Sequence, residues 1–287
     1  MKIVQKICLA IFANTMLSAD LNVVVSIIPQ KSFVEEIGKE HVKVISMTQA
    51  GSNPHTYEPK PSQMKELTHA NIYFSIGVEF EEAWLDKFAS QNKKLKIVDS
   101  SKGVEKIEMI EHHHEKHHEH NHHEHEGKDP HIWLSPSIIK IISKNIYDTL
   151  VENDPQNMGD YEKNYNLFLK KLEDTDVKIK QTFSKLPKNS KFMVFHPSWG
   201  YFAKEYNLIQ VPIEVEGKNP KPQQLQNIIK EAKKENIKAI ITQPEFSQKS
   251  AQTIANELKI NVVSISPLPS NWSETLLEMA KTIADEK

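Results

Sequence analysis

The sequence predicts an α/β protein with two parallel-sheet lobes, each of about four strands with flanking helices, joined by a long rigid helix. Short apolar runs alternate with helical patterns between residues 20 and 100, and again from residue 191 onward. Continuous apolar strands that alternate with helices are typical of parallel sheets covered by helices on both faces. A long amphipathic pattern separates the two halves and is the predicted connector.

Each half contains four apolar runs of strand length, separated by segments with helical periodicity. In the first half, strands are predicted at residues 21–28, 42–47, 72–76 and 95–98, and helices at 30–39, 61–69 and 81–91. In the second half, strands are predicted at residues 191–196, 208–213, 237–242 and 260–265, and helices at 198–206, 221–235, 247–259 and 271–284.

The connector should begin at Pro136, which suits the first turn of a helix, with Ser135 as its N-terminal cap. Asp154-Pro155 should interrupt it, and a second, longer helix should run to about Lys185. About 30 residues give a rod of roughly 45 Å, longer than either lobe needs. We therefore expect a connector rather than an ordinary surface helix. Its apolar stripe consists of Tyr161, Tyr165, Phe168, Leu172, Ile179, Phe183 and Leu186.

These patterns divide the chain into a signal peptide, two lobes and the connector between them. The predicted boundaries are residues 1–19 for the signal peptide, 20–135 for the N-terminal lobe, 136–187 for the linking helix and 188–287 for the C-terminal lobe.

The N-terminus has the features of a secretory signal peptide. Lys2 and Lys6 precede an apolar run that is too short to span a bilayer and that ends in small residues at Ala19. The alternative is a buried N-terminal strand or helix. The only cysteine, Cys8, lies near the start of the run, whereas a lipoprotein carries its cysteine at the end. We therefore expect a periplasmic protein without a lipid anchor. Its mature chain has no thiolate to offer, so any metal it bound would need nitrogen or oxygen ligands.

The composition indicates a soluble globular protein. Hydrophobic residues make up 38% of the chain and charged residues 26%, and the formal net charge is -2. No clustered basic face is visible, so no nucleic-acid partner is expected. A monomer is the expected state.

Residues 104–128 interrupt the pattern with a histidine-rich tract, which we expect to be a mobile loop because it has too little apolar surface to fold. Imidazoles suit zinc, copper and nickel, and the interleaved glutamates attract cations. The alternatives are an inert polar insertion or an artificial tag. The tract is predicted to provide weak auxiliary metal sites through His112, His113, His114, His117, His118, His120, His122, His123 and His125.

Three other histidines stand in better-defined surroundings. His55 lies in a turn-rich loop, His131 lies just before the connector, and His196 ends a predicted strand. Each has a proline beside it, and ligands that are fixed by rigid backbone bind metal at a lower entropic cost. Ligands of open α/β sheets bind outside the carboxyl ends of the strands, where His196 lies. His41 and His69 are interpreted as surface residues.

The segments around these histidines resemble the zinc-type metal-binding lipoprotein and adhesin family, the solute-binding proteins of zinc and manganese ABC transporters. The matching segments are Asn53-Pro54-His55-Thr56-Tyr57-Glu58-Pro59, Asp129-Pro130-His131-Ile132-Trp133-Leu134-Ser135-Pro136 and His196-Pro197-Ser198-Trp199-Gly200-Tyr201. The resemblance covers the mature chain. It implies two four-stranded lobes, a rigid linking helix and one metal site in the cleft, with His55, His131 and His196 as ligands.

The resemblance also bears on the metal. In this family a histidine at the third position accompanies zinc and a glutamate accompanies manganese, so His196 favours Zn²⁺. Three imidazoles suit Zn²⁺, whereas Mn²⁺ prefers carboxylates and water. Two departures affect the fourth ligand: Ser266 replaces a frequent aspartate, and Gln243-Pro244-Glu245-Phe246 displaces the acid of a glutamate-proline-glutamine stretch. Water, Glu58 or a histidine of the tract could complete the site.

The expected function is capture of Zn²⁺ in the periplasm and its delivery to an ABC permease in the inner membrane, without catalysis. The first alternative is a secreted zinc-dependent hydrolase, since three histidines and an open position also form catalytic zinc sites. Against it, the sequence has no HExxH-type motif, and Glu58 is the only acid near the ligands. The second alternative is a periplasmic zinc buffer or chaperone that acts through the tract.

Overall fold

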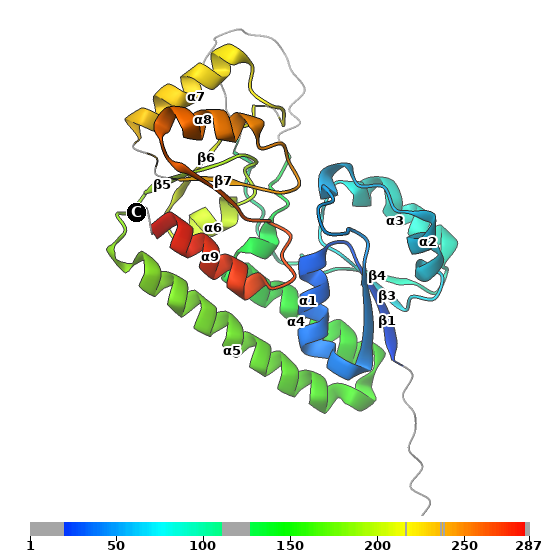
Figure 1. Ribbon diagram of the computed structural model, residues 1–287. Helices are drawn as coiled ribbons and strands as arrows, with labels where there is room; N and C mark the ends of the chain where they lie inside the picture. Colours follow the sequence, from blue (N-terminus) through cyan, green and yellow to red (C-terminus); the bar gives the residue numbers. More distant parts are fainter. Residues whose placement is uncertain (1–19, 111–126, 216, 236, 238, 285–287) are drawn as a thin grey trace, which may run out of the picture.

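The computed structural model describes residues 20–110, 127–215, 217–235, 237 and 239–284. They form two four-stranded parallel sheets with flanking helices, which confirms the predicted fold class (Figure 1). The first sheet has the order β2-β1-β3-β4, and its strands are β1 (Leu21–Val25), β2 (Val42–Ser46), β3 (Ile72–Ser75) and β4 (Lys96–Asp99). The second has the order β6-β5-β7-β8, and its strands are β5 (Lys191–Val194), β6 (Ile209–Pro212), β7 (Ala239–Thr242) and β8 (Asn261–Ser264).

Helices occur in every segment where the periodicity predicts them. They are α1 (Ile28–Gly38), α2 (Pro61–Leu67), α3 (Phe80–Gln91), α4 (Pro136–Asn153), α5 (Met158–Thr182), α6 (Gly200–Glu205), α7 (Pro222–Lys234), α8 (Lys249–Leu258) and α9 (Trp272–Ala284). The largest difference in the first half concerns β1, which ends at Val25 although the apolar run continues to Ile28. The reason is Pro29, which suits the first turn of a helix, so that α1 begins at Ile28.

The connector consists of two helices that pack against each other, α4 and the longer α5. The Ser135 side chain caps α4 by accepting a hydrogen bond from the Ile138 N–H at 3.4 Å. The chain turns at Asp154, as predicted, and the Asp154 carboxylate accepts hydrogen bonds from Asn157 and Tyr161, each at 2.7 Å. The 25 residues of α5 are about 37 Å long.

Helix α5 runs beneath both lobes and contacts α1 of the first and α9 near the chain end (Figure 1). The rings of Phe33 on α1 and Phe168 on α5 both contact the ring of Trp272 on α9. Thus α9, which the sequence division places in the C-terminal lobe, packs on the connector. The domain boundaries themselves remain a prediction.

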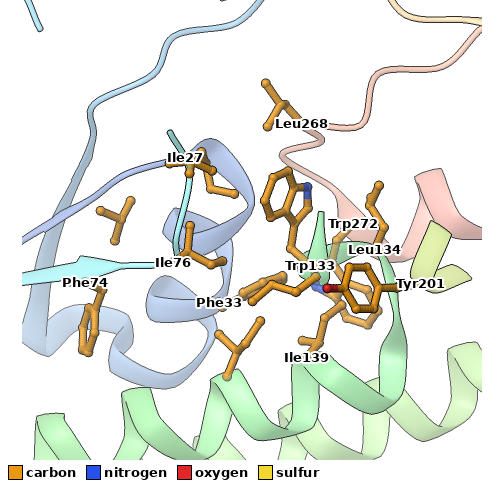
Figure 2. Packing of buried hydrophobic residues seen from close by; sticks show 14 of the residues in the cluster. Ile27, Phe33, Phe74, Ile76, Trp133, Leu134, Ile139, Tyr201, Leu268 and Trp272 are labelled. Atoms are coloured by element: carbon orange, nitrogen blue, oxygen red, sulfur yellow. The ribbon is translucent and has the colours of Figure 1, made fainter. Parts of the chain in front are cut away.

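One hydrophobic core continues across the lobe boundary. In Figure 2, Ile27 and Phe33 of the first lobe and Tyr201 and Leu268 of the second lie around Trp133. Trp133 is 1% exposed, and its Nε1–H donates to the carbonyl of Pro267 at 2.6 Å. The two lobes therefore share a packed core and are not joined by loops alone.

The predicted signal peptide, residues 1–19, and the nine tract histidines lie outside the described residues. The expectation of a mobile loop over all of residues 104–128 is wrong at its N-terminal end. Val104 and Ile107 pack against the core because they are apolar. Glu108 and Lys128 pair in an isolated antiparallel bridge and form an ion pair. Of the described helices, none combines the length and apolarity needed to cross a membrane.

Candidate metal centre

His196 stands directly beyond the carboxyl end of β5, the second strand of its sheet. The residues that hold it follow the two neighbouring strands. Gln243, after β7, accepts from the His196 N–H at 3.1 Å and donates to its carbonyl at 2.7 Å. Glu214, after β6, lies 2.7 Å from His196 Nδ1. The ring of Phe246 stacks on the imidazole at a centroid distance of 4.5 Å. Residues that follow the two neighbouring strands thus hold both the backbone and the side chain of His196.

His131 lies between the two lobes, immediately before the turn that leads into α4. Asp129 Oδ1 accepts two hydrogen bonds from it, from the backbone N–H at 2.9 Å and from Nδ1 at 2.7 Å. Both side chains are buried, His131 at 2% and Asp129 at 1% exposed. Because Pro130 separates them, the short loop has little freedom to move one away from the other.

His55 comes from the first lobe, in a short 3₁₀ turn after β2. Asn53 Oδ1 accepts from the His55 N–H at 2.9 Å and so holds the turn. Nδ1 of His55 lies 2.8 Å from Oε1 of Glu79, which precedes α3. This pair is the more exposed one, since 19% of the His55 side chain and 46% of the Glu79 side chain are accessible to solvent.

The three histidines converge although they are far apart in the sequence. Their candidate ligand atoms all lie within 4.8 Å of one another, and they form the one such group that the described part of the chain contains. Nε2 of His55 and Nε2 of His196 are 3.1 Å apart. Two nitrogens bound to a tetrahedral zinc are separated by roughly 3.3 Å, so this spacing suits a shared zinc ion.

Every imidazole in the group directs Nδ1 at a carboxylate. Such a partner favours the tautomer that carries its proton on Nδ1, which leaves the Nε2 lone pair free for a metal. With both Nδ1 atoms protonated, the facing Nε2 atoms of His55 and His196 repel each other unless a cation lies between them. The arrangement therefore has the chemistry of a cation site.

Burial dominates the electrostatics of the deepest pair. It lowers the pKa of His131 well below the usual 6.5, and the nearby His196 and His55 add to the effect. Burial also raises the pKa of Asp129 to about 7, although the hydrogen bond from the backbone N–H of His131 acts to lower it. A neutral imidazole is the form that binds metal. At Glu79 burial is outweighed by the hydrogen bond and charge of His55, which lower the pKa of that carboxyl.

A cavity of about 270 Å³ adjoins the group and is open to solvent. His55 and His196 line it, together with Thr56, Phe246 and Ile110. A small ion can therefore reach the exposed side of the histidines, while His131 closes the buried side.

The candidates for the fourth ligand have different surroundings. Glu58 is exposed and does not belong to the converging group. The hydroxyl of Ser266 donates to Glu245 Oε1, so the two positions that depart from the family pattern contact each other. Glu245 Oε2 is buried and has no hydrogen-bond partner among the described residues.

The sequence predicted that the three histidines lie together, but not which acids contact them. The expectation that Glu58 is the only acid near the ligands is wrong, because Glu79, Asp129 and Glu214 each bond one imidazole. Asp129 could have been found from its position two residues before His131. Glu79 precedes α3 and Glu214 follows β6, so only the tertiary structure brings these two acids close to the histidines. His69 is exposed, as predicted, whereas His41 is half-buried and lies 3.0 Å from Asp160.

The sequence matches the family model described as ZnuA, zinc-uptake complex component A, periplasmic, over residues 23–286. The protein belongs to this family. Its ZnuA relatives include the high-affinity zinc uptake system protein ZnuA of Bacillus subtilis (strain 168). That protein is 36% identical over 243 residues, which cover 83% of this chain and 75% of the relative.

Solved ZnuA structures have the same fold. A crystal structure of ZnuA is 40% identical with a TM-score of 0.85, and the match covers 93% of this chain and 99% of that chain. A deletion mutant of ZnuA with zinc bound is also 40% identical, with a TM-score of 0.83 over 93% and 97% of the two chains. A manganese ABC transporter substrate-binding lipoprotein, scaA of Streptococcus gordonii, is 28% identical over 258 residues, 85% of this chain and 79% of the relative.

Proposed function

We propose that this ZnuA-family protein captures Zn²⁺ through His55, His131 and His196 and delivers it to an ABC permease. The observation that carries the proposal is the convergence of three imidazoles, each of which has its Nδ1 atom next to a carboxylate. Zn²⁺ is the transported cargo, and the proposal includes no reaction.

Zinc is preferred to manganese on the chemistry of the ligands. The three ligand atoms are imidazole nitrogens, which suit Zn²⁺, and the carboxylates contact imidazoles instead of the ion. The Bacillus subtilis relative is named for zinc uptake, and one solved ZnuA holds zinc. Relatives at 28% identity include manganese proteins, so the metal must be tested.

A water molecule is the fourth ligand in this proposal. The cavity opens beside His55 and His196, so solvent has access to the ion. Glu58 and the tract histidines remain the alternatives. A site that is partly open to solvent suits a carrier. The bond from the ion to water does not have to be broken by a movement of the protein when the ion is released.

The proposed location is the periplasm, where a monomer meets its permease in the inner membrane. The relatives are extracytoplasmic substrate-binding proteins, and several are named lipoproteins. The position of Cys8 supports a chain without a lipid anchor. Labelling with a radioactive fatty acid would detect an anchor.

The proposal is tested by replacing each ligand separately with alanine. His55→Ala, His131→Ala and His196→Ala should each weaken the tight zinc site by about 10-fold or more, because each removes one of the protein ligands. Competition with a zinc-selective chelator measures the affinity, and His69→Ala serves as the control at an exposed histidine. Unchanged affinity in two of the three variants would refute the assignment.

A second arm tests the metal. Excess Mn²⁺ should leave the chelator competition for Zn²⁺ almost unchanged, because imidazole ligands favour zinc. Displacement of zinc by Mn²⁺ at comparable concentrations would replace the zinc proposal with a manganese one, whatever the ligand variants show.

A further inference from the structure

Gly200 lies where the second lobe touches the carboxylate that holds His131. It is the first residue of α6. A Cβ atom at this position would lie 2.5 Å from Asp129 Oδ2 and 3.4 Å from Cδ1 of Ile107. Because separations under 3.0 Å are essentially never found for a real Cβ, any side chain here must displace a neighbour. The requirement for glycine is one of space rather than of backbone conformation, since the residue is helical.

Asp129 cannot yield without releasing His131. Its Oδ1 accepts from both the backbone N–H and Nδ1 of His131, so rotating the carboxylate to free Oδ2 would break both bonds. The Asp129 side chain is also buried, with 1% of it exposed. The hydrogen bonds and the packing thus fix Asp129 against the backbone of Gly200.

The turn that carries Gly200 cannot yield either. Gln210, on β6, accepts from the Trp199 N–H at 2.8 Å and donates to the Pro197 carbonyl at 3.2 Å. Gln210 is 2% exposed and Trp199 is fully buried. The turn is thus clamped to the second sheet just before α6 begins.

Tyr201 adds a direct link from the same turn to the first lobe. Its hydroxyl donates to the Asp129 carbonyl at 2.7 Å and accepts from the Ile107 N–H at 3.1 Å. The segment from His196 to Tyr201 therefore carries one histidine of the site and supports another. Because the same segment carries His196 and supports His131, a small shift of this segment should move both histidines together.

We infer that Gly200 is a positioning residue of the metal site, which leaves the space that Asp129 needs to orient His131. The inference rests on the proposed function. Gly200→Ala should push Asp129 away from the imidazole and weaken the tight zinc site by about 10- to 100-fold, the range found when supports of metal ligands are lost.

The test measures zinc affinity of the full mature chain by chelator competition, with the thermal unfolding midpoint as a check of the fold. Gly159→Ala is the matched control, because Gly159 is also near the start of a helix and a Cβ there meets nothing within 4 Å. The control should bind zinc like the wild type.

A double-mutant cycle separates positioning from a general effect on the fold. Asp129→Ala removes both the clash and the carboxylate, so Gly200→Ala should cause no further loss of affinity in that background. If Gly200→Ala alone does not fold, the double variant should fold because the clash is gone. Tyr201→Phe then supplies a milder test, with an expected affinity loss smaller than that of Gly200→Ala.

Two results would overturn the inference while leaving the proposed function intact. One is wild-type zinc affinity in Gly200→Ala. The other is an equal loss from this change with and without the Asp129 carboxylate. Failure of the wild-type protein to bind zinc, or unchanged zinc affinity in two of the three histidine-to-alanine variants, would instead refute the function itself.

Discussion

At the residue scale, the candidate site is built from three pairs, each an imidazole with its carboxylate. The pairs of His131 and His196 are buried, whereas the His55–Glu79 pair faces solvent in part. A carboxylate on Nδ1 raises the basicity of Nε2 and fixes the orientation of the ring. In a buried pair this interaction is screened little, and in an exposed pair it is screened by water.

We therefore predict that Glu214→Gln weakens zinc binding by about 10- to 100-fold. The amide can present its NH₂ group to Nδ1 and favour the tautomer with a proton on Nε2, which competes with the metal. Glu79→Gln should have a smaller effect, because Glu79 is half-exposed. Chelator competition measures both, and Glu82→Gln on the exposed face of α3 is the control. A larger loss from Glu79→Gln than from Glu214→Gln would contradict this ranking.

At the scale of elements, α5 is important for stability because one of its faces packs against elements of both lobes. Its stripe was predicted from helical spacing, and Tyr161, Phe168, Leu172 and Ile179 of that stripe are buried. Leu172 is fully buried, while Leu167 on the opposite face is 59% exposed. One face of the helix thus packs against the core.

Leu172→Ala should lower the free energy of unfolding by about 2 to 5 kcal/mol, because it leaves a cavity in a packed core. Leu167→Ala should change it by no more than about 0.5 kcal/mol, as for most surface substitutions. Urea denaturation followed by circular dichroism measures both. Equal effects would show that α5 is not part of the shared core.

At the scale of the whole molecule, the described residue Ile110, just before the histidine tract, lies at the candidate site. Ile110 lines the cavity beside His55 and His196, and the Glu108–Lys128 bridge brings the two sides of the tract together. From the polar composition of the tract we expect each metal that it binds to be held more weakly than in the cleft, because flexible ligands must be ordered when they bind. Tethering near the cleft would raise the local zinc concentration.

Deleting residues 112–125 should remove the weak zinc equivalents and leave one tight site with little change in the unfolding midpoint. Titration calorimetry counts the equivalents. Growth under severe zinc limitation should suffer more than growth in zinc-replete medium, because only the capture step is lost. Loss of the tight site on deletion would instead make a tract histidine the fourth ligand.

The sequence by itself determined the alternation of strands and helices, the Ser135 cap, the break at Asp154 and the three histidine segments. These follow from local periodicity, from turn chemistry and from motifs that are contiguous in the chain. They were sufficient to predict the fold class and the convergence of His55, His131 and His196, the last with the help of a family resemblance.

Only the tertiary structure decided which groups surround those histidines. Glu214 and Gln243 reach His196 because β6 and β7 flank β5, and Glu79 reaches His55 from the start of another helix. The closeness of Gly200 to Asp129 likewise arises where the two lobes meet. No local pattern encodes these contacts, because each depends on strand order and on the packing of elements that are distant in the sequence.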